Sequence, residues 1–140
     1  MTTAAAERVL QIVFRFEGVF LGLAIVAVFL PFESMAEIHR LLGMGDLPDR
    51  PIVDYLARSL SLFYAAQAPL YFIAASDLRR FRPLALYLCW FHLALGVLVL
   101  IVDLREGLPP MWTWSEGPPT IAVGLVTLWL LARVPRSAGG

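Results

Sequence analysis

Four long apolar stretches constrain this chain more than any other feature of its sequence. They cover residues 9–30, 52–75, 83–102 and 120–134. A helix needs about 20 residues to cross the hydrocarbon core of a bilayer, and each of the first three stretches has that length. The fourth is shorter but almost entirely apolar. The sequence therefore predicts an all-α integral membrane protein, a bundle of four transmembrane helices in which residues 1–140 form a single transmembrane domain.

The composition agrees with contact to lipid and narrows the possible functions. Charged residues make up 16% of the chain, and its formal net charge is zero, whereas soluble domains contain about 25% charged residues. The balanced charge gives no electrostatic reason to expect a nucleic-acid partner. Cys89 is the single cysteine, which excludes an internal disulfide and a multi-cysteine metal site. We expect neither a metal nor a cofactor.

The distribution of arginine, which supplies every basic side chain, predicts the orientation. One side of the predicted bundle has seven arginines: Arg8, Arg15, Arg79, Arg80, Arg82, Arg133 and Arg136. The other side has four, diluted by acidic residues: Arg40, Arg50, Arg58 and Arg105. Cytoplasmic loops carry the excess of basic residues. We therefore expect a multi-pass protein of the cell (inner) membrane with both termini in the cytoplasm.

The two predicted external loops differ in character. Ser34 and Glu37 have the spacing of a capping box, and residues 35–42 then read as a short amphipathic helix on the outer interface. Gly43 and Gly45 would end this helix. The second loop, residues 107–119, contains two Pro-Pro pairs, which predict an irregular segment without a continuous helix.

Each predicted span places one polar side chain at a similar depth. These candidate intramembrane site residues are Glu17, Gln67, His92 and Thr127. A polar group in lipid is costly, so the layer suggests either a small site with Glu17 and His92 as a titrating pair, or a hydrogen-bonded clasp between helices. In a third interpretation, Glu17 pairs with Arg15 near the interface.

Two further patterns have a structural and a functional interpretation. Asp54 and Arg58 are four residues apart, and Asp103 is a second acid within predicted reach, so these three residues form either a structural ion pair or an anion site near the outer face. Gly18 and Gly22 form a GxxxG motif, which allows either close packing of the first two spans or a homodimer seam.

The layout resembles small bacterial four-helix membrane proteins of the DoxX-like kind. The resemblance rests on residues 30–32 (Leu-Pro-Phe) at the end of the first span, the short helix around residues 38–43, the arginine-rich loop 77–80 and the histidine of the third span. It implies a four-helix fold and a membrane location. It implies no activity, and no functional residues carry over from it.

These observations leave three functional hypotheses. The chain lacks the HExxH, GxSxG, P-loop and GxGxxG motifs, so an enzyme is disfavoured. The favoured hypothesis is a non-catalytic accessory subunit or self-associating bundle, with the bilayer, a second copy or a larger membrane complex as partner. The alternatives are a small transporter or channel that uses the polar layer, and a lipid- or quinone-associated membrane enzyme with His92 and Arg58 as polar contacts.

Overall fold

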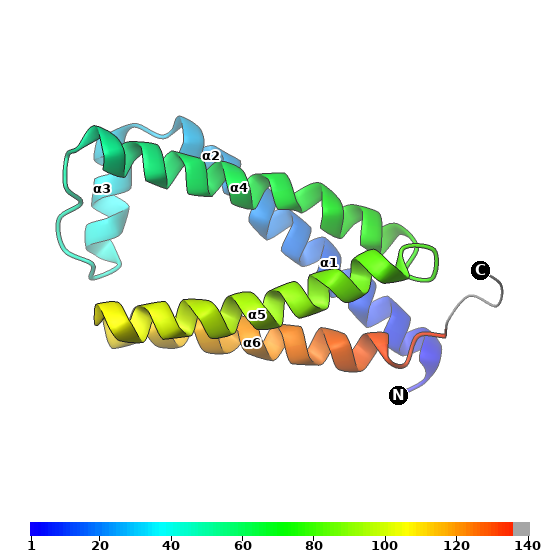
Figure 1. The fold of residues 1–140 in the computed structure, drawn as a ribbon. Helices are drawn as coiled ribbons and strands as arrows, with labels where there is room; N and C mark the ends of the chain where they lie inside the picture. Colours follow the sequence, from blue (N-terminus) through cyan, green and yellow to red (C-terminus); the bar gives the residue numbers. More distant parts are fainter. Residues whose placement is uncertain (136–140) are drawn as a thin grey trace.

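Helices form almost all of the chain in the computed structural model, which describes residues 1–135 (Figure 1). In chain order they are α1 (Thr3–Leu23), α2 (Ile25–Phe29), α3 (Phe32–Leu41), α4 (Pro51–Ser76), α5 (Arg82–Glu106) and α6 (Pro110–Leu131). No strand occurs among residues 1–135. The predicted all-α class is therefore confirmed.

Two of these helical segments are long and apolar enough to cross a membrane. One is the 27-residue segment Thr3–Phe29, in which α1 and α2 follow each other with a turn at Ala24, and the other is α5 with 25 residues. α4 and α6 have 26 and 22 residues. Their prolines and polar residues, such as Gln67 in α4 and Glu116 in α6, make them less apolar.

The helices form two arms. α5 and α6 pack along each other as one arm, and α4 packs against α1 and α2 as the other. Contacts between the arms are far fewer. Figure 1 shows the arms converging where the start of α1, residues 77–81 and the end of α6 lie together, which we call the closed end. They diverge toward α3, at the open end.

The hydrophobic core lies in the half of the molecule near the closed end. Tyr71 of α4 and Leu88 of α5 are fully buried there, together with Leu10 and Phe14 of α1 and Leu130 of α6. Neither α2 nor α3 contributes a buried residue. The four long helices therefore share one packed core only where the arms converge.

Glycines allow the two helices of the second arm to approach at backbone distance. A Cβ atom on Gly124 would lie 2.7 Å from the backbone nitrogen of Leu93, and one on Gly96 would lie 2.7 Å from that of Ile121. Gly117 is equally close to Leu100 of α5. Because glycine has no side chain, the backbones of α5 and α6 come into van der Waals contact, and this contact stabilises the helix pair.

The GxxxG motif of the first span serves the first arm. A Cβ atom on Gly18 would lie 3.0 Å from the ring of Phe72, and one on Gly22 would lie 3.5 Å from the Cβ of Ala68. Both neighbours belong to α4, so the motif packs α1 against α4. This arrangement matches the predicted packing of the first two spans, and a homodimer seam is not needed to explain the motif.

The prediction of an irregular segment over residues 107–119 is wrong. α6 begins at Pro110, with Pro109 as its N-cap, and it continues through Pro118 and Pro119. Pro110 fits because the first helical position needs no amide donor. The inner prolines each remove one amide donor, and the close contact of Gly117 with α5 favours the helix over an irregular chain. The helix therefore starts ten residues earlier than the predicted span.

The predicted helix of the first loop exists, but its start differs from the prediction. α3 begins at Phe32 after an extended Pro31, and no side chain caps it, so Ser34 lies inside the helix and the capping box is wrong. Gly43 and Gly45 follow the helix with φ of +77° and +78°, as predicted for residues that end a helix. The interfacial location of α3 stays a prediction.

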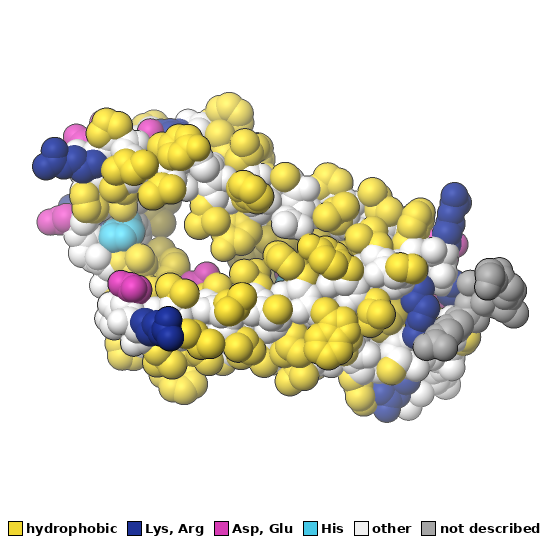
Figure 2. All heavy atoms as spheres, viewed as in Figure 1, with side chains coloured by type: hydrophobic (Ala, Val, Ile, Leu, Met, Phe, Trp, Pro, Cys, Tyr) yellow, Lys and Arg dark blue, Asp and Glu magenta, His cyan; other side chains and the backbone are white. Residues whose placement is uncertain are grey.

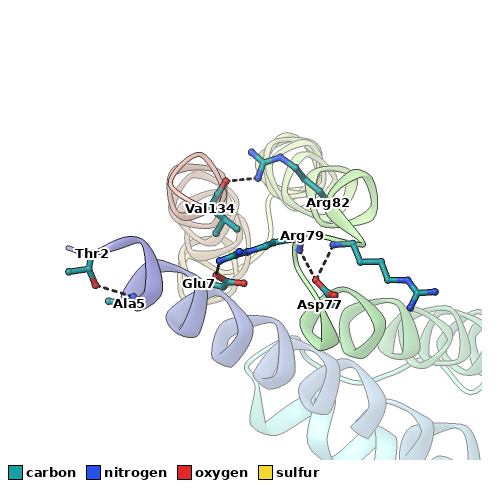
Figure 3. A network of polar contacts seen from close by, with 8 residues as sticks. Thr2, Ala5, Glu7, Asp77, Arg79, Arg82 and Val134 are labelled. Atoms are coloured by element: carbon teal, nitrogen blue, oxygen red, sulfur yellow. Dashed lines mark hydrogen bonds and ion pairs between the residues drawn. The ribbon is translucent and has the colours of Figure 1, made fainter. Parts of the chain in front are cut away.

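Polar contacts join the segments that meet at the closed end (Figure 3). The Arg79 guanidinium donates a hydrogen bond to the Glu7 carboxylate at 2.9 Å, which joins the α4–α5 turn to α1. Arg82 donates to the carbonyl oxygens of Val134 at 2.7 Å and Leu131 at 3.2 Å, where α6 ends. The hydrogen bond and charge of Glu7 raise the pKa of Arg79, so this arginine stays ionised.

Candidate functional site

A cavity of about 530 Å³ separates the two arms where they begin to diverge. Figure 2 shows the molecule hollowed between the arms on the side of the open end. Both arms line the cavity: Phe20 and Leu21 come from α1, Tyr64 from α4, and Leu95 and Val99 from α5. The volume lies within the range of about 300–1,000 Å³ that is typical of small-molecule sites.

Three polar side chains from three helices meet at the floor of this cavity. The Tyr71 hydroxyl lies 2.9 Å from Nδ1 of His92, and Nε2 of the same imidazole lies 3.5 Å from a carboxylate oxygen of Glu17. Phe14 packs edge-on against the Tyr71 ring, which in turn packs edge-on against His92. The residues lie at the boundary between the packed core and the cavity, where Glu17 and His92 contribute to the cavity wall.

The geometry assigns a role to each member of this group. When the Tyr71 hydroxyl donates to Nδ1, the imidazole is neutral and carries its proton on Nε2, which faces Glu17. The histidine is then held by a buried hydroxyl on one side and directs an N–H toward the carboxylate on the other. Such an arrangement can bind a polar group in the cavity or exchange a proton with it.

The sequence left open whether the four polar residues converge, and the structure brings Glu17 and His92 together. Gln67 lies close to them: it lines an adjacent cavity of about 200 Å³ together with Tyr71 and His92, and its side chain makes no hydrogen bond within residues 1–135. The pairing of Glu17 with Arg15 is not observed, because Glu17 faces His92 while Arg15 is exposed.

Thr127 does not join this group. Its hydroxyl donates to the backbone oxygens of Val123 at 2.7 Å and Gly124 at 3.0 Å, within its own helix. The side chain is buried, and it lines neither cavity. The rotation of α6 turns Thr127 away from the site.

The predicted outer-face group is split between the arms. Arg58 pairs with Asp54 at 3.0 Å and also donates to the backbone oxygen of Val28, so it joins α4 to α2. Asp103 belongs to α5 in the other arm and forms no ion pair with Arg58. The divergence of the arms separates them. Only 3% of Asp103 is exposed, and its Oδ2 atom lacks a hydrogen-bond partner in the described part of the chain.

The sequence did not point to four residues of the site: Tyr64, Tyr71, Trp112 and Glu116. Tyr71 follows Gln67 by one helical turn and therefore shares its face, which is a signal that the sequence did contain. Glu116 and Trp112 had been assigned to an irregular loop, and the continuation of α6 through its prolines is what brings them to the cavity.

Comparisons with protein-family models, with curated proteins and with solved structures found no match to this chain. The resemblance to DoxX-like proteins therefore stays a prediction.

Proposed function

We propose that this chain is an integral membrane protein with four crossings that binds a small amphipathic molecule in the cavity between its arms. The observation that carries this proposal is the combination of a cavity of about 530 Å³ with apolar walls and a polar floor of Glu17 and His92. An amphipathic molecule matches this division, with its polar group at the floor and its apolar part along Leu21, Leu95 and Val99.

The exposed surfaces of α4 and α6 support four crossings. Leu60, Leu62 and Phe63 of α4 are more than half exposed, as are Leu125 and Val126 of α6. Leaving such side chains in water forgoes about 1.5–3 kcal/mol each. In lipid they need no partner, and the hydrogen bonds of both helices are satisfied internally. This favours a bilayer around all of the long helices.

The charge distribution supports an orientation with both termini in the cytoplasm. Arginine side chains lie at both ends, but most of the visible acidic side chains lie toward the open end, so the closed end carries the excess of positive charge (Figure 2). The arginines near the closed end include Arg8, Arg79, Arg80 and Arg82. Under the positive-inside rule, the closed end faces the cytoplasm and the cavity lies toward the outer leaflet.

Native mass spectrometry of the chain, extracted in lipid nanodiscs, tests ligand binding. We expect the wild-type protein to retain a small molecule. Val99→Trp fills the cavity from its α5 wall and should release that molecule, while Val97→Trp, on the exposed face of the same helix, should not. Equal retention by both variants, or no retained molecule in any of the three proteins, would contradict the proposal.

A labelling experiment tests the crossings separately. Cys89 is the single cysteine, so Cys89→Ala gives a background for single cysteines at chosen positions. In intact cells, an impermeant maleimide should label Asp46→Cys and Gly107→Cys but not Asp77→Cys. Labelling of Asp77→Cys under these conditions would overturn the proposed topology.

An accessory role or self-association is a separate hypothesis that the cavity does not address. The GxxxG motif that suggested self-association, Gly18 and Gly22, packs against α4 of the same chain. A transport role would require the ligand to leave at the closed end, where the core is packed.

A further inference from the structure

We infer that the ligand of this cavity is a lipophilic cation, a molecule with a positively charged centre and an apolar body. This inference rests on the proposed function and adds the chemical class of the ligand. It follows from the charged groups, the aromatic rings and the apolar side chains that line the cavity.

The ionisable side chains that line the cavity favour a positive guest. Glu17 and Glu116 each present a carboxyl group to it, from α1 and α6 respectively. Within residues 1–135, neither arginine nor lysine lines it. The other ionisable side chain of the wall is His92, which lies 2.9 Å from the Tyr71 hydroxyl and 3.5 Å from the Glu17 carboxylate. A carboxylate surrounded by apolar walls is costly unless a cation accompanies it.

Asp103 is a further acid on the α5–α6 side, although it does not line the cavity. It is buried, and its Oδ2 atom has no hydrogen-bond partner in the described chain. Within residues 1–135, neither Asp103 nor Glu116 forms an ion pair with a basic side chain. No cation of the chain therefore accompanies the acids on this side.

Aromatic rings line the cavity along with the acids. Phe20, Tyr64 and Trp112 come from α1, α4 and α6, so rings reach the space from both arms. The negative face of an aromatic ring attracts a cation, and desolvated contacts of this kind are stronger than exposed ones. Rings and aliphatic side chains together accept a bulky apolar cation, whereas a small hydrated metal ion would need several oxygen ligands. No group of three His, Cys, Asp or Glu side chains suited to a metal occurs among the described residues.

A matched pair of probe ions tests the sign of the charge. Tetraphenylphosphonium and tetraphenylborate have nearly the same shape and opposite charges. Calorimetric titration of the full chain in nanodiscs of zwitterionic lipid, with protein-free nanodiscs as blank, should give saturable binding of tetraphenylphosphonium alone. The double variant Glu17→Gln and Glu116→Gln should weaken this binding at least about tenfold, the size expected for one charged contact.

Glu106→Gln provides the matched control. Glu106 is an exposed acid near the open end, at the end of α5, and it does not line the cavity. We expect this variant to bind tetraphenylphosphonium like the wild type. An equal loss in Glu106→Gln would mean that a diffuse surface field attracts the cation, which would overturn the inference.

The possible outcomes separate this inference from the proposed function. Saturable binding of tetraphenylborate, or equal binding of both ions, overturns the cation inference while the cavity remains a ligand site. Binding of tetraphenylphosphonium that both the double variant and Val99→Trp leave unchanged places the ion outside the cavity and also overturns it. The absence of a retained molecule in the native spectra, together with no saturable binding of either ion, overturns the proposed function as well.

Discussion

The closed and open halves of this molecule are built from the same long helices, but the helices pack differently in each half. In the closed half, α1, α4, α5 and α6 share a core that includes Leu10, Tyr71, Leu88 and Leu130, and arginine contacts tie the ends together. In the open half, the helices remain paired within each arm, but a cavity separates the arms. The same bundle thus combines a packed core at one end with a cavity at the other.

The boundary between the two halves follows from the positions of small residues and polar contacts. If the chain lies in a bilayer as proposed, lipid does not drive apolar helix faces together as water does, and close backbone contacts and hydrogen bonds must hold the helices. Gly96 and Gly124 hold α5 to α6 in both halves, and Gly18 and Gly22 hold α1 to α4. Comparable contacts between the arms are confined to the closed half. Each arm is therefore a stable unit, and their junction determines the size of the cavity.

The largest effect should come from separating the two helices of an arm. In Gly124→Leu, even the first side-chain carbon would lie 2.7 Å from the backbone nitrogen of Leu93, so α5 and α6 must move apart. Overpacking against backbone destabilises by roughly 3 kcal/mol or more. We expect unfolded or aggregated protein after extraction, as judged by size-exclusion chromatography. Ala94→Leu, on the exposed side of α5, should elute like the wild type, and a normal profile for Gly124→Leu would refute the glycine contact.

A pair of identical substitutions on α5 compares the halves directly. Leu88 is fully buried in the closed half, whereas Leu95, two turns later on the same helix, lines the cavity. Leu88→Ala leaves a new void and should cost about 2–4 kcal/mol in the free energy of unfolding. Leu95→Ala only widens an existing space and should cost less than about 1 kcal/mol. Detergent titration measures both, and equal losses would show that the open half is packed like the closed one.

The hydroxyl of Tyr71 marks the boundary between the halves, and its removal should have a moderate effect. Tyr71→Phe keeps the aromatic contacts with Phe14 and His92 but removes the hydrogen bond to Nδ1. A buried acceptor left without a partner costs about 1–2 kcal/mol. The ¹⁵N chemical shifts of His92 should report a changed tautomer. Tyr87→Phe, at an exposed position of α5, should leave both the shifts and the stability unchanged.

The closed half could be predicted from the sequence more completely than the open half. Apolar length predicted the helices, since each long helix overlaps one of the four predicted stretches. Position along the helices suggested Glu17 and His92 as one possible pair, and their contact in the structure agrees with that alternative. The position of a residue along a helix does not determine how that helix is rotated, however. For this reason the sequence grouped Thr127 with the other polar residues, although its hydroxyl bonds within α6.

The structure of the open half depends on contacts between helices that are distant in the sequence, and no local sequence pattern predicts these contacts. Pro118 and Pro119 argued against a helix, yet contact of Gly117 with α5 holds one there and brings Glu116 to the cavity. Asp103 and Arg58 are within reach of each other only if the arms stay parallel. The divergence of the arms results from the positions of all the interhelical contacts together, and spacing along a single helix could not predict it.

The smallest effect should come from the ion pair that joins the arms at the closed end. Glu7→Gln removes the charge that faces Arg79, a pair that remains partly exposed to solvent. Exposed pairs contribute little and are screened by salt, so we expect a slight fall in melting temperature that disappears at high ionic strength. Because the raised pKa of Arg79 keeps this side chain charged, its contribution is lost at the alkaline end only at strongly alkaline pH. The difference between variant and wild type should therefore stay constant from neutral to moderately alkaline pH. A difference that grows in salt, or one as large as that of Leu88→Ala, would show that the arms are joined by charge more than by their core.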